Sequence, residues 1–299
     1  MRIKQYIQTH KSNRKGLASR RFVRSGFGNF LNFFLIFSAG IFTMLPLIYA
    51  VVTSLKPLDE LLIFPPRFFV SKPTLSNYLV LPDLISALKV PLSRYVFNSI
   101  MVSTVTSLLY IIVAAMAAFA LAKATFYGRN LIFWLVQFAL MFSTCTLAVP
   151  QYLIFSKLRL IDTYWVYLLP SMASTFGVFL MKQYIEGYLP EALLEAARID
   201  GANHYRIFFS IVMPMIKPAC FTVFLFMFRD VWANVPNGTI FTEKLKTLPQ
   251  IVNQITAEGT ARTGSSMAVT VIMMIPPIII YLVTQSNVVE SMNSAGIKE

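Results

Sequence analysis

Long apolar stretches separated by short charged connections run through the whole chain. A helix needs about 20 residues to cross the hydrocarbon core of a bilayer. Six stretches bounded by charged residues have about that length or more, and they cover residues 30–55, 95–122, 130–155, 161–185, 213–232 and 265–284. Because a helix in lipid satisfies its own backbone polar groups, the pattern predicts an all-α integral membrane protein with six transmembrane helices, within a membrane domain of residues 25–288.

The composition supports lipid as the solvent of much of this chain. The mean hydropathy is +0.64 and 13% of the residues are charged, which is too apolar for a soluble surface. A formal net charge of +13 would suggest a nucleic-acid partner in a soluble protein. Here the basic residues gather in the N-terminal arm and in short connections, so we interpret them as charges that set membrane orientation and expect no nucleic acid.

The placement of basic residues predicts the orientation, because Lys and Arg near the span ends concentrate in the cytoplasm. The N-terminal arm, residues 1–24, carries eight Lys or Arg residues and no acid. The second and fourth connections contain Lys123, Arg129, Lys182, Arg198 and Arg206. We therefore expect both termini in the cytoplasm, with residues 289–299 as a C-terminal tail. The apolar run after the arm is longer than a signal-peptide core, so we expect it to be retained.

Groups suited to catalysis or metal binding are scarce. Cys145 and Cys220 lie in apolar stretches without CxxC spacing or a nearby His, so they indicate neither a metal site nor a disulfide. No GxxxxGK[ST] phosphate loop occurs in the chain. We expect no catalytic residue and no cofactor held by this chain. An ion-coupled secondary transporter is a less favoured alternative, because none of the first four predicted spans has an acidic residue in its interior.

The fourth connection is not a simple loop. Pro190 suits the first turn of a helix, and Glu191 suits the positive end of its dipole. Gly201 suits a left-handed stop, and Asn203 can cap a following helix. The sequence therefore predicts two short cytoplasmic helices joined at a sharp bend, within residues 189–212.

The first of these short helices has a charged ridge. At about 100° per residue, Glu191, Glu195 and Arg198 fall within an arc of about 60°. Ala196 and Ala197 keep the helix slim enough for another surface to approach it. An interfacial helix lying on headgroups would need a Lys/Arg-rich polar face, and the two carboxylates argue against that alternative. We predict a docking surface for a cytoplasmic partner, through which force on the element moves the bundle.

The same stretch matches a motif of known proteins: Glu-Ala-Ala, three residues, Gly, nine residues, Ile, one residue, Leu, Pro. The matching positions are Glu195, Ala196, Ala197, Gly201, Ile211 and Pro214. Met213 stands where Leu is usual, which is an apolar exchange of similar volume. The chain resembles the permease subunits of ATP-binding-cassette importers, and the resemblance implies that Arg198, Asp200 and Ala202 belong to the same docking stretch.

The resemblance extends over nearly the whole chain, toward the carbohydrate-uptake branch of that family. Further similar stretches are Asn98 with Ser99, residues 126–129, residues 199–202 within the motif, and the stretch from Gln285 through residues 294–298. The resemblance implies a type I importer permease fold in a bacterial inner membrane. It also implies a heterodimer with a sibling permease, two cytoplasmic ATPase subunits that hold ATP and Mg, and a solute-binding protein. An oligosaccharide is the expected solute; phosphate, a polyamine or a peptide is the alternative.

The fifth predicted span differs from the pattern of the similar proteins. Residues 229–234 stand where a Trp-Asn pair is more usual, and they include the charged neighbours Arg229 and Asp230. These two are either an interfacial or structural pair, or part of a solute path. Trp232 and Asn234 are candidate sugar contacts, because aromatic faces and amides suit polyhydroxylated ligands. The alternative for Trp232 is a place in the aromatic belt at the outer interface.

Overall fold

The structure, a computed structural model, describes residues 26–86, 89–142, 144–236, 238–257, 259 and 262–296. The chain divides into two compact units, Met1–Tyr49 and Ala50–Glu299. The predicted N-terminal arm and the last three residues of the predicted tail lie outside the described part. All regular structure within the described ranges is helical, as the apolar pattern predicts.

Three helices of the described part are long and apolar enough to cross a membrane. They are α2 (Gly26–Ser54), α6 (Leu92–Lys123) and α16 (Thr263–Gly296). A fourth crossing results if His204–Met215 and α14 (Lys217–Ala233), which are bent by 78° relative to each other, form one span.

The third and fourth predicted spans are each broken into two helices. The third contains α7 (Arg129–Ala139) and α8 (Thr144–Lys157), and the fourth contains α9 (Trp165–Met172) and α10 (Phe176–Tyr188). The longest of these four has 14 residues, which is too few to cross a bilayer unaided. Helix length therefore does not confirm the count of six crossings, which stays a prediction.

A side chain from α6 stabilises the break between α9 and α10. The hydroxyl of Tyr110 donates a hydrogen bond to the carbonyl oxygen of Ser174 at 2.7 Å and accepts one from the backbone N–H of Gly177 at 3.0 Å. Backbone groups freed by a break at membrane depth need such partners. A Cβ on Gly177 would lie 2.6 Å from the Tyr110 ring, so the absence of a side chain there permits this approach.

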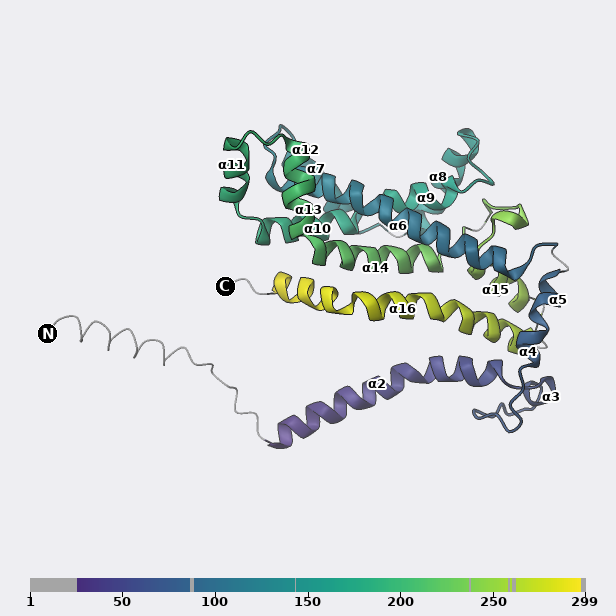
Figure 1. Ribbon diagram of the computed structural model, residues 1–299. Coiled ribbons are helices and arrows are strands. Elements are labelled where there is room, and N and C mark those ends of the chain that lie inside the picture. The colour runs from purple at the N-terminus through teal and green to yellow at the C-terminus, as the bar shows by residue number, and fades with distance from the viewer. Residues whose placement is uncertain are drawn as a thin grey trace. The chain divides into compact units, whose positions relative to one another are not determined.

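Helix α6 packs along α10, α14 and α9, and α14 also packs along α16 (Figure 1). Ala114, Ala115 and Ala118 of α6 are fully buried. Small residues of this kind let membrane helices approach closely, which favours their packing. A second hydrophobic cluster includes Phe228 and Trp232 of α14 and reaches α16.

The two ends of this unit differ. At one end, α10 leads into α11 (Glu191–Ile199) and α12 (His204–Ile207), followed by the π-helix η1 (Phe208–Val212) and α13 (Met213–Met215). The opposite end holds α15 (Leu248–Ala257) together with α4 (Ser76–Leu79) and α5 (Leu81–Ser86) (Figure 1). The other short helices outside the long bundle are α3 (Leu58–Leu61) and the 3-10 helix η2 (Glu243–Leu245).

Candidate functional site

The bend between α11 and α12 is held by backbone and side-chain hydrogen bonds. Gly201 has a left-handed φ of 76°, and its N–H donates to the carbonyl oxygen of Arg198 at 3.0 Å. A positive φ is the conformation that glycine adopts without strain. The side chain of Asn203 accepts a hydrogen bond from the N–H of Arg206 at 2.8 Å and caps α12. The bend is therefore short and fixed.

One face of α11 anchors the helix and the other is open. Leu194 and Ala197 are buried, with 3% and 8% of their surface exposed, and belong to the main hydrophobic cluster. The exposed predicted docking residues of the helix and bend are Glu191, Glu195, Ala196, Arg198, Asp200 and Gly201. The residues of the charged ridge, Glu191, Glu195 and Arg198, are thus all exposed. Ala197, in contrast, packs into the main hydrophobic cluster.

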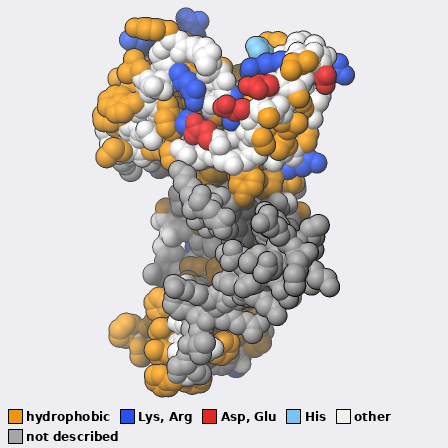
Figure 2. Space-filling model, turned by 90° about the vertical axis from the view of Figure 1, so that its left-hand side faces the viewer, with side chains coloured by type: hydrophobic (Ala, Val, Ile, Leu, Met, Phe, Trp, Pro, Cys, Tyr) orange, Lys and Arg blue, Asp and Glu red, His pale blue; other side chains and the backbone are white. Residues whose placement is uncertain are grey.

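The remaining motif residues serve the packing that follows the bend. Ala202 and Ile211 are half-buried against the main cluster, and Pro214 is exposed in α13. Two further apolar residues of this element are open: Ile199 is 86% and Tyr205 is 69% exposed. Figure 2 shows acidic, basic and hydrophobic side chains mixed in the upper part of the view, where this element lies. A surface of this mixed character suits a protein partner.

The four candidate solute-path residues are divided by the structure. Arg229 and Asp230 form an ion pair at 3.0 Å, and their side chains are 66% and 61% exposed. Asn234 is half-buried at the end of α14. Trp232, in contrast, is 3% exposed, and its indole N–H donates to the carbonyl oxygen of Met273 in α16 at 3.0 Å. The structure thus places the Trp232 ring in the core between α14 and α16.

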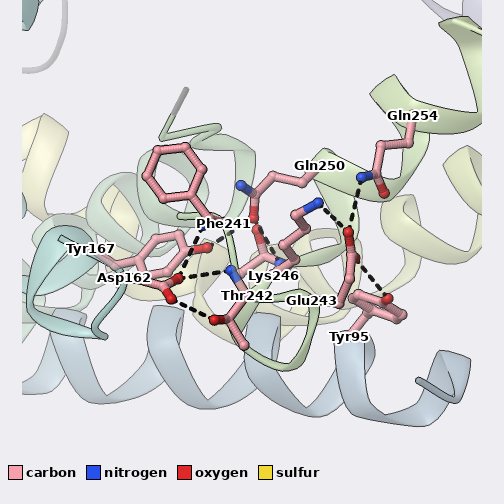
Figure 3. A network of polar contacts seen from close by, with 10 residues as sticks. Tyr95, Asp162, Tyr167, Phe241, Thr242, Glu243, Lys246, Gln250 and Gln254 are labelled. Atoms are coloured by element: carbon pink, nitrogen blue, oxygen red, sulfur yellow. Dashed lines mark hydrogen bonds and ion pairs between the residues drawn. The ribbon is translucent and has the colours of Figure 1, made fainter. Parts of the chain in front are cut away.

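The segment between α14 and α15 is held by hydrogen bonds to Asp162, a residue of the turn between α8 and α9. One oxygen of its carboxylate accepts hydrogen bonds from the backbone N–H groups of Phe241 at 3.0 Å and Thr242 at 2.8 Å. The second oxygen accepts the Thr242 hydroxyl (Figure 3). Nothing in the local sequence signals this contact, because the partners are about 80 residues apart.

Further polar contacts hold the same segment on α6. Glu243 accepts hydrogen bonds from Tyr95 at 3.2 Å and Gln254 at 3.4 Å, and it forms an ion pair with Lys246 (Figure 3). Asn98 is fully buried and donates to the carbonyl oxygens at positions 244 and 246, at 2.8 and 2.9 Å. These contacts give partners to Tyr95 and Asn98 at the start of α6, and they make the segment a fixed part of this end of the bundle.

Within the ranges that the structure describes, no group of three His, Cys, Asp or Glu side chains could hold a metal ion. Two features stand out at the ends of the bundle. One is the bend between α11 and α12, and the other is the segment between α14 and α15 that Asp162 and Asn98 hold in place. Together with the long apolar helices, these elements define a helical, membrane-embedded protein that presents a rigid charged helix pair.

Comparison with known proteins identifies the family. Residues 111–294 match the family of binding-protein-dependent transport system inner membrane components. The chain belongs to this family, which confirms the resemblance to importer permeases and gives it a role in transport rather than catalysis.

Its relatives are permease proteins of such systems. The inner membrane ABC transporter permease protein YcjP of Escherichia coli is 28% identical over 86% of this chain and 92% of the relative. The arabinooligosaccharides transport system permease protein AraQ of Halalkalibacterium halodurans is 31% identical, over 67% and 72%. The sulfoquinovosyl glycerol transport system permease protein SmoH of Agrobacterium fabrum is 29% identical, over 85% and 89%.

The fold also has a counterpart among solved structures. A chain of a bacterial ABC transporter involved in the import of the acidic polysaccharide alginate aligns with a TM-score of 0.68 and 23% identity. The alignment covers 88% of this chain and 98% of the other. The fold is therefore that of an ABC importer permease.

Proposed function

We propose that this chain is the membrane-spanning permease subunit of an ATP-driven importer of a carbohydrate, with an oligosaccharide as the expected solute. The observation that carries the proposal is the α11–α12 element. It combines a buried anchoring face, an exposed ridge of Glu195 and Arg198, and a bend fixed by Gly201. Such an element can receive a partner without deforming.

The proposed complex contains a sibling permease, two cytoplasmic ATPase subunits that hold ATP and Mg, and an extracytoplasmic solute-binding protein. Membership in a binding-protein-dependent transport family supports this set of partners. Six crossings with both termini in the cytoplasm of a bacterial cell would place α11 and α12 on the same side as the ATPase subunits. The strongly basic N-terminal arm supports that orientation.

In this mechanism the exposed ridge of α11 docks on an ATPase subunit, and ATP binding and hydrolysis there displace the helix. Leu194 and Ala197 pack the other face of α11 into the core. Because packed cores have low compressibility, a displacement of α11 moves the adjacent helices with it. The bundle then exposes the solute path alternately to the two sides of the membrane.

The carbohydrate assignment is supported by the relatives that carry arabinooligosaccharides and sulfoquinovosyl glycerol in their names. In this chain we propose the open face of α14 with Arg229, Asp230 and Asn234 as the part nearest the solute. Charges on a membrane helix are costly against lipid, so this face suits water, solute or the sibling subunit. Trp232 lies on the buried side of α14, where its hydrogen bond to Met273 attaches α14 to α16.

The docking role is tested with Glu195→Lys and Gly201→Asp in the assembled complex. Both variants should insert in the membrane, yet they should weaken co-purification of the ATPase subunits or uncouple hydrolysis from uptake. Asp59→Lys is the matched control, because it makes the same kind of charge change on an exposed residue of α3, far from the motif in sequence. Normal assembly and normal uptake in both docking variants would refute the proposal.

The solute class is tested on the solute-binding protein that co-purifies with the complex. A calorimetric screen against oligosaccharides, phosphate, polyamines and peptides should show the tightest binding for an oligosaccharide. Preference for any of the other three classes would replace the carbohydrate assignment and leave the importer assignment intact.

A further inference from the structure

A cluster of opposite charges joins α7 and α10 close to the start of α11. Lys182 Nζ lies 2.7 Å from Oε2 of Glu186, one turn further along α10. The guanidinium of Arg129, the first residue of α7, lies 3.6 Å from Oε1 of the same carboxylate. Lys182 also lies 3.7 Å from the centroid of the Phe133 ring of α7. Glu186 therefore holds one cation from each of two helices.

Arg129 connects this cluster to the end of α6. Its Nε donates to the carbonyl oxygen of Leu121 at 2.7 Å, and its terminal nitrogen donates to that of Ala122 at 3.0 Å. The last carbonyls of a helix lack partners within the helix, and a cation there also interacts favourably with the helix dipole. Gly128, with φ of 87°, forms the turn that brings Arg129 back to these carbonyls. The guanidinium of Arg129 thus caps the C-terminus of α6 and also pairs with Glu186.

A second contact continues the connection to the docking helix. Lys123, the last residue of α6, lies 3.6 Å from the carboxylate of Glu191, the first residue of α11. The Glu191 side chain is 79% exposed, so this ion pair is weak and can open at little cost. In contrast, the Lys182 side chain is only 8% exposed. Removal of Glu186 would leave this buried side chain without its ion-pair partner, which costs stability.

The cluster lies on the route that the proposed mechanism needs. Helix α10 runs into α11 through Leu189 and Pro190, and Glu186 lies within the last turn of α10. Near the start of α10, Gly177 packs against Tyr110 of α6. The helices are therefore joined at both levels: by close packing near Gly177 and by charge near Glu186. At the level of Glu186, α6 and α10 also pack together in the main hydrophobic cluster, and the charged junction adds α7 to them.

We propose that Glu186 is a positioning residue for coupling. It locks the ends of α6, α7 and α10 together, so that a displacement of α11 moves the three helices as one body. The inference rests on the proposed function, because it assumes that an ATPase moves α11. It goes beyond that function by assigning the transmission of movement to an ionic cluster outside the docking motif.

The test is Glu186→Gln in the complete importer, reconstituted in proteoliposomes with its binding protein. The variant complex should assemble and hydrolyse ATP, but uptake should fall, so that the number of ATP molecules hydrolysed per solute rises by roughly fivefold or more. A residue with a merely structural role would lower the amount of complex and leave this ratio unchanged. Asp59→Asn removes an acid that takes part in no ion pair among the described residues, and it should keep the wild-type ratio.

A second variant keeps the test decisive if Glu186→Gln fails to fold. The double variant Lys182→Met with Glu186→Gln removes both partners, so no unpaired charge stays buried, yet it lacks the junction with Arg129. It should assemble and show the same raised ratio. A wild-type ratio in the variants that assemble would overturn this inference alone. A wild-type complex without ATP-driven uptake would overturn the proposed function together with it.

Discussion

Gly177→Ala should disrupt the packing of α10 against α6. The added Cβ would lie 2.6 Å from both Cε1 and the hydroxyl oxygen of Tyr110, and 2.9 Å from Cγ1 of Val223. Carbon atoms in contact normally stay about 3.5–4.0 Å apart, so the ring must shift by about 1 Å. The ring cannot shift freely, because its hydroxyl bonds to the carbonyl oxygen of Ser174 and to the N–H of residue 177.

The expected cost can be worked out from these contacts. Overpacking of a well-packed core costs about 1–3 kcal/mol, and loss of two hydrogen bonds adds about 1 kcal/mol each. The better helix preference of alanine returns about 1 kcal/mol. The free energy of unfolding should therefore fall by about 3 kcal/mol in Gly177→Ala.

Gly187→Ala is the matched control, since it makes the same substitution on the same helix. Nothing lies within 4 Å of a Cβ at that position, so the variant should be as stable as the wild type or up to about 1 kcal/mol more stable. The assay is thermal unfolding of purified protein in detergent, followed by the fraction that stays monodisperse after heating. Equal melting temperatures for the two variants would refute the packing of Tyr110 on α10.

Three further changes test other parts of the structure. Asp162→Ala should speed amide hydrogen exchange in residues 239–247 by about tenfold or more, since two N–H groups lose a charged acceptor; unchanged exchange would show that this contact does not hold the segment. Trp232→Phe should lower the free energy of unfolding by about 1–2 kcal/mol through loss of the bond to Met273, measured by thermal unfolding, without changing the apparent KM for uptake. A changed KM would show that the Trp232 ring takes part in the solute path. Asp230→Asn should reduce uptake while leaving ATPase assembly intact, and normal transport would exclude Asp230 from that path.

Much of the fold could be predicted from local patterns. The long apolar runs predict α2, α6 and α16, because length and hydropathy alone decide whether a helix suits a bilayer. Pro190 and Gly201 predict the limits of α11, because their backbone preferences act locally. The charged ridge of α11 also follows from helical periodicity.

Features that depend on contacts between distant residues could not be predicted. The break before α10 requires the hydroxyl of Tyr110, which is 64 residues from Ser174. The clamp of Asp162 on Thr242 crosses 80 residues. Trp232 illustrates the same limit, because the sequence cannot tell an aromatic ring facing solute or headgroups from one bonded to Met273. In the cluster around Glu186, the i,i+4 spacing of Lys182 and Glu186 is visible in the sequence, but the pairing of Glu186 with Arg129 of α7 is not.

The most direct test of the central claim is uptake of a labelled oligosaccharide by proteoliposomes containing this chain, its sibling permease and the ATPase subunits. We predict accumulation that requires both ATP and the solute-binding protein and that is lost in Glu195→Lys. Accumulation driven by an ion gradient without ATP, or full ATP-driven uptake in Glu195→Lys, would contradict the account.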